Sequence, residues 1–217
     1  MVNKVIKRIK SCGFFAAIFY YYRRILNLLY VLSTFGRMDL NLPYDSQIIG
    51  IKNIRFGNRV VAGRGLWLEA LEKYEECSPK QKFAPQIIIG DDVSFGEYVH
   101  IGSNHKVMIG NNVLLGSKIY ITDHNHGKYT GSVHDAPCLI PKKRQLSDNS
   151  YVIIEDNVWI GENCAILPGV TIGYGSIIGS NSVVTHDIPA YCIAVGSPAQ
   201  VKKVYNKTKG VWVKYDK

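Results

Sequence analysis

The sequence predicts an all-β fold, a parallel β-helix of about five to six coils that carries a helical segment at its amino terminus and a protruding loop. Aliphatic or aromatic residues recur every six positions over most of the chain, which does not fit the 3.6-residue period of a helix and fits a simple hairpin protein badly, because the turns come too often. Glycine commonly follows the recurring residue, where a tight corner favours a small side chain. The 217 residues, 47% of them apolar, suffice for one domain with an appendage.

Residues 1–47 are the predicted helical, amphipathic segment. Its first 36 residues include six basic side chains and no acidic one, and the apolar runs on either side of Arg23 and Arg24 are each shorter than the roughly 20 residues that span a bilayer. Arginines rather than a small-residue cleavage site follow the first run, which argues against a signal peptide. The segment is expected either to make peripheral contact with a membrane or to pack within an oligomer.

Residues 48–200 form the predicted β-helix domain, in which three six-residue sides make one turn of about 18 residues and each side buries one aliphatic side chain. Residues 48–69, 87–122 and 152–195 carry the repeat. The spacing leaves the hand of the coil open, because parallel crossovers are normally right-handed. The recurring residues are Ile89, Phe95, Ile101, Ile109, Leu115, Ile121, Ile154, Ile160, Ile166, Ile172, Ile178 and Val184.

The formal charge of +9 is concentrated at the two ends of the chain. Residues 201–217, the predicted basic tail, hold six lysines and one aspartate, whereas residues 37–200 hold 14 basic and 16 acidic residues. A near-neutral body argues against nucleic acid as a partner. Five cysteines without a CxxC pair indicate a reducing compartment, so we expect a cytoplasmic protein, at the inner face of the membrane if residues 1–36 bind there. Cys164 and Cys192 lie within apolar patterns and are expected in the core.

Residues 123–151 interrupt the period with a polar loop, and a loop of this length that leaves and rejoins a solenoid is usually functional. The loop opens with Asp123, His124, Asn125 and His126. An imidazole with a pKa of about 6.5 can take a proton from a hydroxyl at neutral pH. His124 is therefore a candidate general base. Asp123 could orient an imidazole, although its place next to His124 in the sequence does not establish that pairing.

Several motifs resemble the hexapeptide-repeat acyltransferases, a family of left-handed parallel β-helices. The motifs are Asn157 to Gly161, Ile166 to Gly173, Ser182 to Pro189 and Gly196 to Ala199. Ile121 to Gly127 and Gly65 to Ala70 narrow the resemblance to bacterial sugar O-acetyltransferases of capsule, O-antigen and exopolysaccharide pathways. The resemblance implies a left-handed coil, acetyl-CoA as the acyl donor, no metal, and a homotrimer with active sites at subunit interfaces.

The same resemblance implies an acetyltransferase that acts on a sugar hydroxyl in polysaccharide or lipopolysaccharide biosynthesis. His124 matches the family's catalytic histidine and would act by direct transfer, without an acyl-enzyme intermediate. Glu162 and Gln200 stand where the galactoside enzymes have a serine and an arginine, so those two contacts with the cofactor are not carried over. The residues expected to line the cofactor groove are Trp159, Gly161, Ser180, Thr185, His186 and Lys203.

The acceptor site is less well defined by the sequence. Gly96 stands where the galactoside enzymes hold their sugar with an asparagine, so a galactoside acceptor is not supported. The candidates for acceptor binding are Asn104, Tyr98, Asp123 and His126, with Trp67, Glu69 and Arg144 as further candidates.

Two other functions stay open at this point. The first is a zinc-dependent, carbonic-anhydrase-like β-helix enzyme, for which His100, His105, His124 and His126 offer nitrogen ligands. Their spacing, however, does not put an obvious third ligand on a coil face. The second is a non-catalytic β-helix scaffold, against which the presence of His124 argues.

Overall fold

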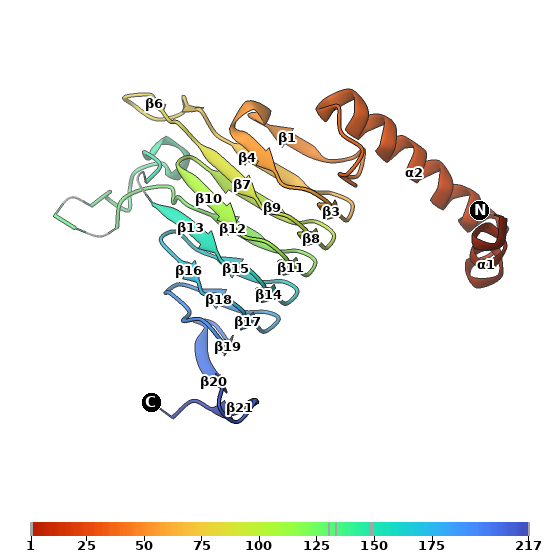
Figure 1. Ribbon diagram of the computed structural model, residues 1–217. Coiled ribbons are helices and arrows are strands. Elements are labelled where there is room, and N and C mark those ends of the chain that lie inside the picture. Colours follow the sequence, from red (N-terminus) through yellow and green to blue (C-terminus); the bar gives the residue numbers. More distant parts are fainter. Residues whose placement is uncertain (1, 130, 133, 148–149, 217) are drawn as a thin grey trace.

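The computed structural model describes residues 2–129, 131–132, 134–147 and 150–216, and its body is a three-sided parallel solenoid (Figure 1). Sheet A contains, in spatial order, β21 (Val211–Lys214), β20 (Gln200–Asn206), β19 (Cys192–Val195), β17 (Ile177–Ile178), β14 (Trp159–Ile160), β11 (Leu114–Leu115), β8 (Ser94–Phe95) and β3 (Val61–Ala62). Sheet B contains β1 (Gln47–Ile49), β4 (Trp67–Ala70), β9 (His100–Ser103), β12 (Tyr120–Thr122), β15 (Ala165–Ile166) and β18 (Val183–Val184). Sheet C contains β16 (Thr171–Ile172), β13 (Tyr151–Ile154), β10 (Lys106–Ile109), β7 (Gln86–Ile89) and β2 (Ile54–Phe56).

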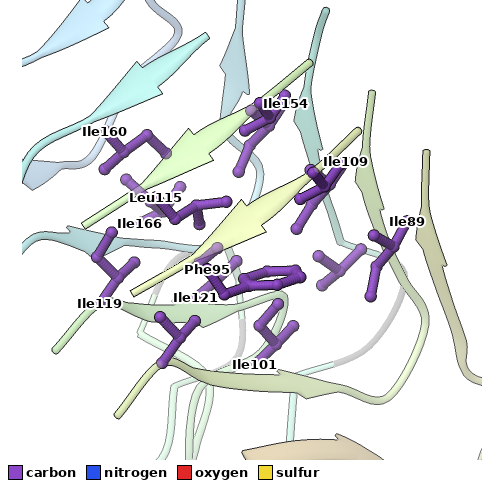
Figure 2. Packing of buried hydrophobic residues seen from close by; sticks show 14 of the residues in the cluster. Ile89, Phe95, Ile101, Ile109, Leu115, Ile119, Ile121, Ile154, Ile160 and Ile166 are labelled. Carbon is purple, nitrogen blue, oxygen red and sulfur yellow. The ribbon is translucent and has the colours of Figure 1, made fainter. Parts of the chain in front are cut away.

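The recurring aliphatic residues form straight ladders inside the solenoid. Ile89, Ile109, Ile154 and Ile172 stand in register on successive strands of sheet C, and equivalent ladders run along the other two sheets. Figure 2 shows side chains of these ladders, among them Ile89, Ile109 and Ile154, pointing toward one another between the sheets. Cys164 and Cys192 are buried in the same core, as their apolar surroundings predicted. Each side buries two side chains rather than the one expected, because the residue two positions before the recurring one also points inward, as Val93 does before Phe95 and Val158 before Ile160.

The corners between the sides repeat one backbone conformation. Asn157, Asn163 and Asn181 have positive φ angles of 59°, 57° and 60°, a left-handed conformation that asparagine tolerates better than most residues. The corner glycines serve another purpose, because a Cβ on Gly90 would lie 2.7 Å from the backbone of Gly110 on the next coil. Close stacking of the coils thus requires glycine there.

The amino terminus forms two helices, α1 (Val2–Cys12) and α2 (Phe14–Phe35), which turn at Gly13. The last turns of α2 cover the first coil of the solenoid. Val31 is fully buried in the core, and the ring of Phe35 packs edge to face on that of Phe56, with 5.4 Å between the ring centroids. Figure 1 shows the rest of α2 leading away from the sheets, with α1 at its far end. Among the described residues, no helix is both long and apolar enough to cross a bilayer.

A second insertion accompanies the predicted loop. Residues 71–85 leave the solenoid after β4 and form a hairpin of β5 (Lys73–Tyr74) and β6 (Gln81–Lys82). Elsewhere in the chain, short 3-10 helices occur at Ile51–Asn53 and Pro141–Lys143. The side chain of Gln81 donates to the carbonyl of Leu146 at 3.0 Å and accepts the N–H of Leu146 at 2.7 Å. The hairpin therefore clamps the later part of loop 123–151. The sequence analysis did not predict it, because residues 71–85 carry no six-residue period.

The carboxy terminus continues the fold beyond the last parallel coil. The sequence analysis described residues 201–217 only as a basic tail, whereas β20 and β21 pair antiparallel and extend sheet A from β19. The reversal needs the turn at Gly210, which has a φ of 67°. This hairpin covers the end of the β-helix, so the edge of sheet A is not left as an open parallel strand.

Candidate active site

Asp123 and His124 follow β12, where the chain leaves sheet B for the long loop. The Nδ1 of His124 lies 2.9 Å from Oδ1 of Asp123, whose side chain is fully buried. An ionised carboxylate accepts the hydrogen on Nδ1, which leaves the lone pair of Nε2 to accept a proton. This contact favours the tautomer of His124 that a general base needs.

Four more donors hold the carboxylate of Asp123. The hydroxyl of Ser103 donates to Oδ2 at 2.7 Å, the backbone N–H of Asn104 donates to Oδ1 at 2.9 Å, and those of His105 and Lys106 donate to Oδ2 at 2.9 and 2.7 Å. Burial alone would raise the pKa of Asp123, but the hydrogen bonds from the imidazole, the hydroxyl and the backbone amides outweigh it and lower the pKa. The carboxylate stays ionised and has one orientation.

These donors come from an irregularity in the preceding coil. The buried aliphatic residue recurs eight positions on, at Ile109, instead of six positions after Ile101. The two extra residues let three successive backbone N–H groups converge on one carboxylate, an arrangement typical of anion-binding nests. The irregular spacing is visible in the sequence. That it faces Asp123 follows only from the pairing of β9 with β12.

Gly102 leaves space beside the imidazole of His124. Of the 20 glycines in the chain, it alone has neither a positive φ nor a neighbour that a Cβ would meet at less than 3 Å. A Cβ on Gly102 would lie 3.6 Å from Cε1 of His124 and 3.9 Å from Nε2 of His100, which are ordinary contacts. Packing of the coils therefore does not require glycine at this position.

An aromatic row crosses sheet B next to the catalytic candidate. The row consists of three residues in register on β4, β9 and β12, namely Trp67, His100 and Tyr120. The rings of Trp67 and His100 are stacked, with 4.0 Å between their centroids. The Nε2 of His100 is buried and has no hydrogen-bond partner among the described residues. Burial, and then the charge of His124, lower the pKa of His100, so its imidazole is neutral at pH 7.

The predicted acceptor residues do not converge on one point. Asn104 is buried, and its side-chain amide donates to the carbonyl of Ser147 at 2.7 Å, so it ties the end of the loop to the coil. His126 lies exposed against Tyr74, with ring centroids 5.6 Å apart, and burial, followed by the charge of His124, lowers its pKa. Tyr98 lies at a corner between sheets A and B with a φ of 56°, below the guanidinium of Arg64.

The predicted cofactor residues lie on sheet A and the corner after it, at the corner after sheet B that also carries His124, and on β20. Trp159 stands half-exposed on sheet A, and Gly161 and Ser180 are stacked at the following corner, where a Cβ on the glycine would be 2.6 Å from the N of Ser180. Thr185 and His186 follow β18 and contact each other, with 2.7 Å between Oγ1 and Nδ1. Lys203 lies on β20, paired with Ile193 and Lys214.

Two corners of the three-sided solenoid thus carry different parts of the predicted site. His124 lies where sheet B ends, whereas Trp159 lies on sheet A itself and Gly161 and Ser180 lie at the corner that follows it. A single chain does not bring the two corners together, because sheet B separates them. In the described residues, moreover, no group of three or more His, Cys, Asp or Glu side chains is placed to hold a metal ion.

Comparisons with known proteins agree with this architecture. The model of the family described as "Bacterial transferase hexapeptide (six repeats)" matches residues 151–186. The chain is 34% identical over 214 residues to "Putative lipopolysaccharide biosynthesis O-acetyl transferase WbbJ" of Escherichia coli (strain K12), covering 99% of this chain and 100% of that protein. It is 36% identical over 123 residues to galactoside O-acetyltransferase of Lactococcus lactis, covering 54% of this chain and 55% of that protein.

Solved structures give the same fold at low sequence identity. The N-acyltransferase AntD from Bacillus cereus, in complex with dTDP and 3-hydroxybutyryl-CoA, superposes with a TM-score of 0.62 at 18% identity, over 79% of this chain and 82% of that one. Together with the parallel three-sided topology and the hexapeptide match, this likeness confirms the predicted fold, a left-handed parallel β-helix.

Proposed function

This chain belongs to the hexapeptide-repeat acyltransferase family and is an acyltransferase, and from that premise we propose an acetyl-CoA-dependent O-acetyltransferase that acts on a sugar hydroxyl in lipopolysaccharide or other surface-polysaccharide biosynthesis. The resemblance drawn from the sequence is confirmed by the full-length relative. The single observation that carries the proposed chemistry is the 2.9 Å contact between Nδ1 of His124 and the buried carboxylate of Asp123, which leaves Nε2 to act as a base.

The proposed reaction is direct transfer. Nε2 of His124 removes the proton of a sugar hydroxyl while the oxygen attacks the thioester carbonyl of acetyl-CoA. The tetrahedral intermediate collapses, the C–S bond breaks, and the imidazolium returns its proton to the departing thiolate, giving the O-acetyl sugar and free CoA. Asp123 stabilises the imidazolium that forms in between and holds its orientation, so we give it a positioning role rather than a contact with the sugar.

We propose that the enzyme works as a homotrimer with each site between two subunits. Support comes from the two corners that flank sheet B: His124 follows sheet B, while the predicted groove residues lie on sheet A (Trp159) and at the corner after it (Gly161 and Ser180). A three-fold arrangement would place the first corner of one subunit against the second corner of its neighbour. In that arrangement Thr185, His186 and Lys203 complete the contacts with CoA, and Asn104, Tyr98 and His126 remain the candidate acceptor residues.

The experiment measures release of free thiol from acetyl-CoA in the presence of a panel of sugars, nucleotide sugars and lipid-linked glycans. We expect at least one sugar acceptor to be acetylated, and the His124→Ala variant to lose about 100-fold or more of that rate, within the range usual for general bases. His134→Ala is the matched control, because His134 lies in the same loop and, among the described residues, its side chain hydrogen-bonds only with the carbonyl of Gly131. Transfer by His124→Ala at the wild-type rate would refute the mechanism, and no transfer to any sugar would refute the substrate class.

A further inference from the structure

The two amino-terminal helices leave a continuous apolar face uncovered. Along α2 the exposed apolar side chains follow the spacing of three and four residues that makes one stripe of a helix. Phe15, at the start of the stripe, is 84% exposed, whereas Val31 on the opposite side is fully buried in the core. The stripe consists of Phe15, Ile18, Tyr22, Ile25, Leu29 and Leu32. Scattered exposed apolar residues need no explanation, but a contiguous stripe of this kind does.

Several arginines lie on the other side of α2 from this stripe, facing the first coil. A cavity of about 700 Å³ lies between the helices and the first coil, and its walls include Arg8, Arg23, Arg24 and Arg64. Arg64 pairs with Glu97 at 3.0 Å, whereas the three helical arginines form no ion pair with the described residues.

An aromatic ring fixes two of these guanidinium groups. Arg8 lies 3.8 Å above the centroid of Tyr20, and Arg24 lies 6.0 Å from the same centroid. Guanidinium groups suit phosphate oxygens because of their planar, forked donors. The cavity therefore offers a phosphate group several donors that the protein itself does not use.

We infer that α1 and α2 dock on an anionic membrane surface, with the apolar stripe of α2 in the acyl boundary and the arginines of the polar face attracting the anionic headgroups. The helices are too short or too polar to cross a bilayer, which fits a segment that lies in the interface. A second copy of the helices is the less suitable cover. Each copy would bring six basic residues and no acidic one from residues 1–36, so the copies repel each other, whereas anionic lipids complement that charge.

The inference does not depend on acetyl transfer, so the two can fail separately. The experiment is co-sedimentation of the full chain with vesicles of phosphatidylcholine alone and of phosphatidylcholine with phosphatidylglycerol, at about 0.1 M salt. We expect binding to the anionic vesicles, weakened by added salt, and little binding to the neutral ones.

Three sets of variants separate the parts of the surface. The triple variant Arg8→Gln, Arg23→Gln, Arg24→Gln should lower affinity for anionic vesicles about a hundredfold, since each basic residue near a membrane contributes roughly a factor of five. The triple variant Phe15→Ser, Ile18→Ser, Ile25→Ser should lose binding to a similar extent. The control, Lys207→Gln, Lys209→Gln, Lys214→Gln, removes the same charge from the other end of the chain and should bind almost as the wild type.

Each remaining outcome overturns the inference. Wild-type protein that does not bind anionic vesicles contradicts it, and so does an arginine variant that binds as well as the wild type. Loss of binding in the arginine variant but not in the serine variant would mean that the protein is only attracted to the vesicle surface by charge. The apolar stripe would then not insert, which contradicts the inference. If soluble pyrophosphate binds the wild type and not the arginine variant while vesicles bind neither, the cavity takes a soluble phosphate and the membrane contact is refuted.

Discussion

Asp123 shows how donors from another coil decide what a carboxyl group does. Its side chain accepts hydrogen bonds from Ser103, from three backbone N–H groups and from His124. Of these donors, only His124 is a neighbour of Asp123 in the sequence. With these donors satisfied, the carboxylate is held ionised although it is buried. The imidazole beside it is oriented by the protein before any substrate binds, which reduces the reorganisation that proton transfer requires.

The first prediction concerns Asp123→Asn. The amide –NH₂ would face donors where the carboxylate oxygens accept, and the tautomer of His124 would no longer be fixed, so we expect kcat to fall by about 100-fold or more. Stability should also fall, because at least one buried N–H would lose its acceptor, at a cost of about 1–3 kcal/mol. Thiol release and chemical denaturation measure the two effects. Asp216→Asn, at the exposed end of the chain, is the control, and equal activity of both variants would contradict the positioning role.

The second prediction compares two glycines. Gly102→Ala should leave the free energy of unfolding unchanged or slightly higher, because the new methyl group meets only ordinary contacts and the unfolded chain loses freedom. Gly90→Ala should be destabilising by about 2 kcal/mol or more, because its methyl group would lie 2.7 Å from the backbone of the next coil. Urea denaturation of both variants is the measurement. Similar destabilisation by the two substitutions would show that Gly102 is also required by coil stacking.

At the scale of elements, the β5–β6 hairpin and loop 123–151 behave as one unit. Gln81 clamps Leu146, and the adjacent Ser147 accepts from the amide of Asn104 through its carbonyl and from the backbone N–H of Asn125 through its hydroxyl oxygen. The hairpin is therefore linked, through a few hydrogen bonds, to the residues that flank His124 in space.

The third prediction follows from this linkage. Gln81→Ala removes both hydrogen bonds to the backbone of Leu146, so the end of the loop should lose its fixed position, and kcat for acetyl transfer should fall about tenfold. The core of the solenoid contains none of these atoms, so its cooperative thermal unfolding should change little. Gln145→Ala, one residue away from the clamped position in the same loop, is the control. Activity equal to the wild type in the Gln81 variant would show that the clamp does not serve the site.

At the scale of the whole molecule, the partly buried His100 and the exposed His126 make stability depend on pH. Burial and the charge of His124 lower the pKa of His100 and His126 in the folded protein. The unfolded chain has histidines with a pKa of about 6.5, so below that pH it binds protons that the folded chain does not. The contribution to stability is complete above about pH 6.5 and is lost as the pH falls. Asp123 adds nothing in this range, because its lowered pKa affects stability only below the ordinary carboxyl range.

The fourth prediction is therefore a fall in the free energy of unfolding as the pH is lowered from about 7 to 5. Urea denaturation at several pH values measures it. The His100→Gln variant, which removes one of the two groups, should show a smaller fall over the same range. An identical fall in the variant and the wild type would mean that other groups cause the pH dependence.

The body of the fold could be predicted from the sequence because its interactions repeat. One aliphatic residue in every six, from Ile89 to Val184, defines the sides of the solenoid, and a glycine such as Gly90 marks the corner at which the next coil stacks. The hairpin of residues 71–85 could not be predicted in this way, because its strands pair only with each other and its clamp depends on a contact between Gln81 and Leu146, which are 65 positions apart.

The sequence by itself determined the three-sided parallel solenoid and pointed to His124, since both follow from the local period and from the place where it breaks. Only the tertiary structure decided that Asp123 is the partner of His124, and that Ser103 and the amides after it hold that carboxylate. It also decided that His124 follows a strand of sheet B whereas Trp159 lies on sheet A. The physical reason is register: residues from different coils meet only after the strands have paired, and β9 and β12 pair at an offset of 20 positions (His100 with Tyr120), which the regular 18-residue turn does not give.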